Sequence, residues 1–113
     1  MRLFFWKDNF MIDNFAKQLA DDCFGSTPPP LLSAYFDPPV DAEKTKKSNA
    51  QRDATERRLY DMALKVVQFK QQMKLGIYGK ARLLMTFQER LVELGYEHTQ
   101  AERLGRHLLR RTA

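Results

Sequence analysis

Cysteine is nearly absent from the chain, because Cys23 stands alone among 113 residues. A lone cysteine excludes an intramolecular disulfide and any metal site built from clustered cysteines. Such sparing use of cysteine is typical of a reducing compartment, so we expect a cytoplasmic protein. Cys23 falls on the apolar side of a helical segment, which favours a small core residue over a nucleophile.

Long apolar runs are also missing. No stretch approaches the roughly 20 apolar residues that a membrane-spanning helix needs, so we expect no transmembrane segment. The apolar opening of the chain stops at Lys7 and Asp8, before it reaches the length of a secretory signal core. Met11 offers a second start for translation, which leaves the true start at Met1 or Met11 open.

The residue patterns of enzymes and cofactor sites are lacking too. The two histidines, His98 and His107, lie on either side of a helix start and do not have a ligand spacing on one helix face. Gly79 and Lys80 follow Gly76 closely, but the longer glycine cradle and the Ser or Thr of a phosphate-binding loop are absent. We therefore expect no catalytic residue, no metal ligand and no cofactor, and hence a protein that is not an enzyme.

The chain does contain the apolar periodicity of helices. Apolar residues recur at intervals of three and four on both sides of a short break from Gly76 to Gly79. We expect a helical hairpin over residues 60–96, against which the rest of the chain packs. The expected inward positions are Met62, Ala63, Val66, Val67, Phe69, Met73, Ala81, Leu83, Leu84, Phe87, Leu91, Val92 and Leu94. The expected outward positions of the second helix are Arg82, Thr86, Glu89, Arg90 and Glu93.

Glycines mark the expected helix ends. Gly76 followed by Ile77, and Gly95 followed by Tyr96, fit a stop in which the next apolar residue packs back on the last turn. Thr99 with Glu102 fits a capping pair that starts a last helix. The segment after Gly76 is therefore expected to be a helical hairpin with a short connection.

Prolines divide the chain into regions. All five prolines fall within residues 26–50, where we expect a proline-rich, extended linker. Residues 1–25 comprise an apolar N-terminal segment and an amphipathic helix from about Asn9 to Phe24. Residues 51–113 comprise a basic region of three helices, the first of which starts at Ser48 or Asp53. We expect one folded all-α domain of about four helices.

Apolar side chains gather in two places that a small core does not obviously cover. They are Leu3, Phe4, Phe5, Trp6, Leu31, Leu32, Tyr35 and Phe36. Uncovered apolar surface of this kind marks protein–protein contacts, whereas packing on the protein's own helices is the alternative. Our first hypothesis is a non-enzymatic regulatory or adaptor protein that binds another protein or a second copy of itself.

Positive charge concentrates in the helical half of the chain. Residues 1–47 hold six Lys and Arg against seven Asp and Glu, whereas residues 48–113 hold thirteen against seven. In the last helix a basic ridge lies opposite the apolar positions around Leu104. Its members are Arg103, Arg106, His107 and Arg110, and Arg111 extends it.

The basic ridge leads to an alternative function. Arginines near a helix C-terminus complement the helix dipole, but so many of them also suit phosphate groups. The alternative is therefore a nucleic-acid-binding regulator that uses the C-terminal helix. The preceding long helix is expected to help with Arg57, Arg58 and Lys65.

Overall fold

The computed structural model describes residues 5–37 and 46–112, with side chains for residues 9–37 and 49–110. Nearly all of this part of the chain is helical, which confirms the all-α class. The described ranges hold five helices rather than about four: α1 (Phe5–Ser26), α2 (Pro29–Phe36), α3 (Lys46–Met73), α4 (Ile77–Leu94) and α5 (His98–Thr112).

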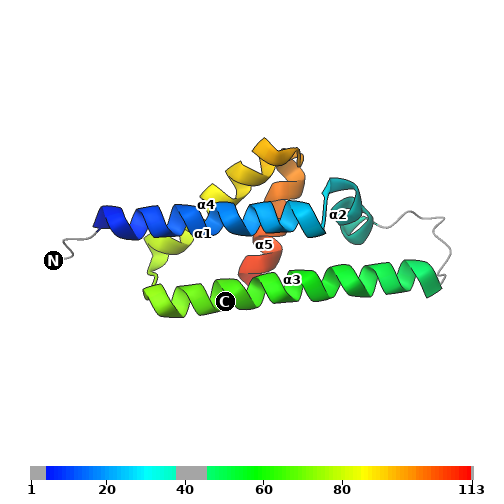
Figure 1. The fold of residues 1–113 in the computed structure, drawn as a ribbon, viewed down its shortest axis with the longest axis horizontal. Coiled ribbons are helices and arrows are strands. Elements are labelled where there is room, and N and C mark those ends of the chain that lie inside the picture. The colour runs from blue at the N-terminus through cyan, green and yellow to red at the C-terminus, as the bar shows by residue number, and fades with distance from the viewer. Residues whose placement is uncertain (1–4, 38–45, 113) are drawn as a thin grey trace.

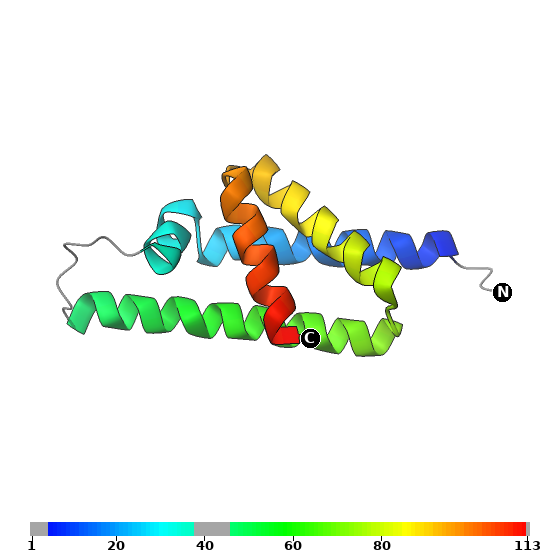
Figure 2. The ribbon, with the colours of Figure 1, turned by 180° about the vertical axis from the view of Figure 1, so that it is seen from behind.

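The helices form two layers. α1 and α3 are two long antiparallel rods, and α4 and α5 cross one face of this pair, as Figures 1 and 2 show from opposite sides. α1 packs most closely on α4, while α5 packs on both α3 and α4. α2 lies at one end of the pair, where it packs on α3 and α5. This arrangement brings α2, which begins with two prolines, beside the basic C-terminal helix.

Small side chains let α1 and α4 approach closely. Ala16, Ala20 and Cys23 are all buried on one face of α1, because their spacing of four and three residues matches the helical repeat. Phe87 and Leu91 of α4 are buried in the same core. Cys23 and both α4 residues were expected in the core, and the structure confirms these positions.

The partner of α4 differs from expectation. Residues 60–96 do not close into a hairpin, because α4 packs mainly on α1 and α3 packs mainly on α5. The connection between α3 and α4, residues 74–76, does not dictate the direction of α4. The position of α4 therefore depends on which helix offers the apolar face that fits it best, and that helix is α1. The hairpin expected after Gly76 is confirmed, since α4 and α5 pack together across a short turn.

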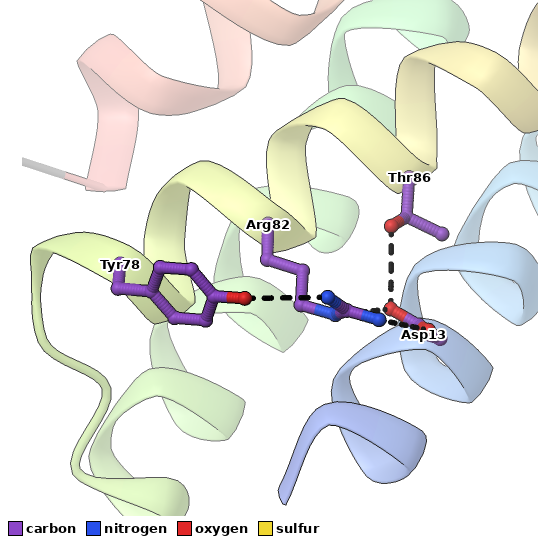
Figure 3. A network of polar contacts seen from close by, with 4 residues as sticks. All are labelled: Asp13, Tyr78, Arg82 and Thr86. Atoms are coloured by element: carbon purple, nitrogen blue, oxygen red, sulfur yellow. Dashed lines mark hydrogen bonds and ion pairs between the residues drawn. The ribbon is translucent and has the colours of Figure 1, made fainter. Parts of the chain in front are cut away.

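A polar network fastens α4 to α1 (Figure 3). Arg82 Nε and Nη2 donate to Asp13 Oδ1 and Oδ2 at 2.9 and 2.8 Å. Thr86 Oγ1 donates to Asp13 Oδ1 at 3.3 Å, and Arg82 Nη1 donates to the Tyr78 hydroxyl at 3.4 Å. The bonds from Arg82 and Thr86 hold the pKa of the Asp13 carboxyl below its ordinary value, with Arg82 as the main cause. The bond to Asp13 raises the pKa of Arg82.

The outward orientation expected for part of α4 is therefore wrong. Arg82 and Thr86 face α1, and Arg90 repeats the arrangement by donating from Nε to Asp21 Oδ1 at 2.9 Å. These polar residues flank the buried stripe of α4, and carboxylates of α1 lie within reach of them. Hydrophobic periodicity does not reveal such partners, because the acids belong to a helix about 70 residues earlier.

The extended conformation expected for Leu31–Phe36 is also wrong, because this stretch is helical. Pro28 is the N-cap, with φ −63° and ψ 166°, and prolines fill the first helical positions. Proline is tolerated there, since the first turn of a helix has no acceptor for its N–H. The N–H of Leu32 donates to the Pro28 carbonyl at 3.0 Å. The helix stops at Phe36. Asp37 follows it and precedes the next proline, and helices often end just before such a residue.

The stop expected at Gly95 is confirmed. Gly95 has a left-handed backbone with φ 119°, and the N–H of Tyr96 donates to the Leu91 carbonyl at 3.0 Å. Helix α5 then begins at His98, one residue earlier than the expected cap at Thr99.

The stop expected at Gly76 is wrong. Lys74 takes the left-handed conformation with φ 51°, and the N–H of Leu75 donates to the Lys70 carbonyl at 3.1 Å. Leu75 packs against the core, in the role expected for Ile77. Gly76 instead precedes α4, and the side chain of Ile77 is 89% exposed.

Tyr96 connects the α4–α5 turn to the α1–α2 turn. Its hydroxyl donates to the Thr27 carbonyl at 2.5 Å and lies 3.5 Å from the sulfur of Cys23. Burial raises the pKa of both Tyr96 and Cys23. This buried network fixes the start of α2 against the start of α5.

Candidate functional site

A concavity of about 330 Å³ lies between the end of α2 and the basic side of α5. Its lining consists of Phe36, Arg103, Arg106, His107 and Arg110. The three arginines expected to form a ridge on the last helix are therefore brought to one hollow, together with an aromatic ring from α2.

The opposite side of α5 fixes the direction of these arginines. Ala101, Leu104 and Leu108 are buried, and they recur at the helical spacing that turns residues 103, 106 and 110 away from the core. Gly105 lies where α4 comes closest, because an added Cβ would clash with Gln88 and come within 2.7 Å of Leu84 Cδ1.

Gln100 attaches α2 to α5. Its Nε2 donates to the Pro29 carbonyl at 2.9 Å and to Ser33 Oγ at 2.6 Å. Its Oε1 accepts from the N–H of Glu97 at 3.3 Å, so the same side chain also caps the start of α5. These bonds hold the first turns of α2 against α5.

Three rings meet at the edge of the concavity. The centroids of Tyr35 and Phe36 are 5.6 Å apart, and that of His107 lies 6.3 and 5.9 Å from them. All three pairs have the edge-to-face geometry that aromatic rings prefer. The rings therefore form a packed cluster that joins α2 to α5.

Two guanidinium groups lie over these rings. Arg103 is 4.7 Å above the centroid of Phe36, and Arg52 of α3 is 5.3 Å above that of Tyr35. Arg103 Nη1 also donates to Asp37 Oδ2 at 2.7 Å. The ring and the carboxylate together restrict the position of the Arg103 guanidinium.

Among the described residues, positive charge exceeds negative charge around the concavity. Glu102 is the nearest acid to Arg106, at 3.7 Å, and it also contacts His98 at 2.9 Å. Arg110 is exposed on the same lining. Three arginines of α5 thus stand against the two carboxylates of Asp37 and Glu102, before Arg52 is counted.

The α3 cations expected to help lie outside this lining. Arg57, Arg58 and Lys65 are exposed, and Arg58 Nη1 donates to the Ser26 carbonyl at 2.8 Å, at the end of α1. The side chain of Arg111 lies outside the described residues. Sequence reasoning missed Arg52 and Asp37, because only the folding of α2 against α3 and α5 brings them to the site.

The residues predicted to bind a protein partner have mixed positions. Leu32 is buried in the core, and Leu31 is partly buried. Tyr35 and Phe36 are partly buried in the ring cluster. Leu3 and Phe4, and the side chains of Phe5 and Trp6, lie outside the described residues, so their role stays a prediction.

A smaller apolar pocket of about 30 Å³ lies between α3, α4 and α5. Lys70 and Lys80 stand among its otherwise mainly apolar lining. Burial lowers the pKa of Lys70, and the nearby charge of Lys80 adds to this effect. A volume of this size holds about two water molecules, so the pocket is a packing feature rather than a ligand site.

Within the described part of the chain, no cluster of three or more His, Cys, Asp or Glu side chains has the arrangement of a metal site. None of the described helices is long and apolar enough to cross a membrane. Comparisons of the chain with protein-family models, with curated proteins and with solved structures find no match.

Proposed function

We propose that this is a non-enzymatic protein that binds nucleic acid through the concavity between α2 and α5. The observation that carries the proposal is the convergence of Arg103, Arg106 and Arg110 on one lining with Phe36. Planar guanidinium groups suit phosphate oxygens better than lysines do. The buried cysteine is in keeping with action in the cytoplasm, which we include in the proposal.

The binding energy in this proposal is mainly electrostatic. Each arginine that neutralises a phosphate releases condensed counterions, so affinity falls as the salt concentration rises. A net charge of +5 for the whole chain would also speed the approach to a polyanion.

The test is a salt titration of binding to single-stranded and duplex probes, read by fluorescence anisotropy. A variant carrying Arg103→Gln, Arg106→Gln and Arg110→Gln should bind more weakly and show a shallower salt dependence. On a single strand, the slope of log affinity against log salt should fall by about 1.4, because the phosphate contacts of Arg106 and Arg110 contribute about 0.7 each and Arg103 is already paired with Asp37.

A matched control changes the same number of charges elsewhere. Lys17, Lys74 and Lys80 are exposed and lie outside the concavity, so their replacement by Gln should leave most of the slope in place. An Arg57→Gln, Arg58→Gln, Lys65→Gln variant should also lose less affinity than the concavity variant. The proposal fails if the wild type binds no probe at low salt, or if the concavity and control variants behave alike.

A second candidate function is self-association through α4. Its outer side exposes Tyr78 and Met85, together with Ala81 and Val92, which were wrongly expected to face inward. Their intervals of three, four and seven residues match the seam between two packed helices. A second copy of this chain supplies such a helix, so we propose two-fold pairing of α4 with α4. Size-exclusion chromatography with light scattering tests it. The wild type should be a dimer and Met85→Glu a monomer, whereas a monomeric wild type at the highest soluble concentration would rule the pairing out.

A further inference from the structure

We infer that the concavity binds unpaired bases, so that its ligand is single-stranded nucleic acid, with Arg103 as the plane on which a base stacks. This inference rests on the proposed function and names the form of its ligand. It starts from the way in which the Arg103 guanidinium is held.

Arg103 lies over an aromatic ring and remains partly exposed. Its guanidinium lies 4.7 Å above the Phe36 ring, and Nη1 is held by Asp37 Oδ2 at 2.7 Å. The side chain nevertheless keeps 46% of its surface exposed. A guanidinium is planar by its own bonding, so the side of Arg103 turned away from Phe36 can serve as a stacking surface. Nucleic-acid bases stack readily on arginine planes.

A second stack of the same kind adjoins the first. Arg52 lies 5.3 Å above Tyr35, whose ring centroid is 5.6 Å from that of Phe36. Consecutive residues at the end of α2 therefore carry a guanidinium each. Stacking platforms beside a basic groove are how proteins hold single strands, because every base has an aromatic face.

Arg106 and Arg110 suit the phosphates of the same strand. They lie four residues apart on the lining of the concavity, so they are neighbours on one side of α5. In this arrangement bases stack on Arg103 and Arg52, and phosphates bind Arg106 and Arg110. Each of the four arginines described at this site then contacts the strand.

The shape of the site argues against a duplex. Reading a duplex with a helix requires a protruding helix that enters a groove about 12 Å wide. The arginine side of α5 instead lines a hollow beside α2, while the helix packs on α3 and α4. A flexible single strand can enter such a hollow, and its bases are free to turn toward the arginine planes.

The test compares three short probes at one low salt concentration: a base-bearing single strand, its duplex, and an abasic strand with the same phosphates. The wild type should bind the base-bearing strand about tenfold more tightly than either of the others. Arg103→Lys keeps the charge but loses the plane, so it should remove most of this preference and leave abasic binding nearly unchanged. Thermal unfolding checks that the variant folds.

Arg110→Lys is the matched control. Arg110 lines the same hollow, and no ring of the described residues is recorded beneath its guanidinium, so this change should preserve the preference for bases. Equal binding of the base-bearing strand and either of the other probes by the wild type would overturn the inference while leaving nucleic-acid binding intact. So would an Arg103→Lys variant that weakens base-bearing and abasic binding alike. If the wild type binds no probe, the inference and the proposed function both fail.

Discussion

Lys74 is the residue whose backbone the fold constrains most visibly. Its φ of 51° is left-handed, a conformation that costs a residue with a Cβ about 1–2 kcal/mol. Lys74→Gly should therefore raise the free energy of unfolding by about 1 kcal/mol, since glycine fits the end of a helix in this form. Urea denaturation measures the change. Gln68→Gly, at an exposed position more than one turn inside α3, should instead lower stability by about 1 kcal/mol, and a loss of stability in both variants would contradict this account.

Asp13 should make the stability of the protein sensitive to acid. Its folded-state pKa lies below the ordinary value because of the bonds from Arg82 and Thr86. The stabilisation is therefore complete above the unfolded-state pKa of about 3.9, and it is lost as the pH falls through the lower folded-state value. Asp13→Asn should lower the melting temperature near neutral pH, and the difference from wild type should shrink below about pH 4.

Melting curves across this pH range supply the check on Asp13. Asp61→Asn is a suitable control, because Asp61 is exposed on α3 and lies outside the network. A difference between Asp13→Asn and wild type that stays constant from neutral to acid pH would contradict a stabilising role for the carboxylate.

At the scale of helices, the contact of α4 with α5 depends on one missing side chain. Glycine ordinarily weakens a helix, so alanine at position 105 has the better helical propensity. Gly105→Ala should nevertheless stabilise the protein less than an alanine at an open helical position does, because the new Cβ meets the side-chain ends of Leu84 and Gln88, which must move aside. Gly25→Ala in α1 is the matched control, since an added Cβ there has nothing within 4 Å.

The two glycine substitutions should differ in size, with the larger gain at Gly25. Gly25→Ala is expected to stabilise by about 0.5–1 kcal/mol, and chemical denaturation of both variants gives the comparison. An equal or larger gain from Gly105→Ala would contradict close packing of α4 on α5 at this position.

Sequence patterns predict where the helices lie along the chain better than they predict which helices pack together. The apolar repeats locate α1, α3, α4 and α5 because each buries one side, which periodicity reports directly. They miss α2, because its prolines read as helix breakers although they occupy a first turn. They also miss Lys74 as a helix stop, because lysine has no intrinsic preference for the left-handed region.

The candidate site is predictable only in part. The spacing of Arg103, Arg106 and Arg110 places them on one side of a helix, which sequence alone shows. Their aromatic partner Phe36 belongs to a segment that sequence assigns to a different surface. Only the packing of α2 against α5 turns a basic ridge into a hollow with a ring in it.

At the scale of the whole molecule, the sequence pattern does not determine which helices pack against one another. Both α3 and α4 have apolar sides broad enough for two neighbours, so several pairings satisfy the same pattern. The small residues Ala16 and Ala20 allow the closest approach at α1, which commits α4 to that helix. Phe15 and Phe69 then stack at 4.1 Å between centroids and join α1 to α3 across the layer.

The first turns of α3 extend beyond the buried part of that helix. Residues 49–53 are exposed, and burial begins at Thr55. A short stretch of helix with so little packing is marginally stable in water. Its amide hydrogens should therefore exchange with solvent much faster than those of residues 55–66, which mass spectrometry or NMR can resolve. Uniform protection along α3 would contradict this.

Arg52 lies in that lightly held stretch, although its guanidinium reaches Tyr35. A strand that stacks on Arg52 would tie down the turn around it, and part of the binding energy would be spent on ordering the backbone. Amide exchange at residues 49–53, near the N-terminal end of α3, should then slow when a single strand is added. This change would report that the strand has bound in the concavity.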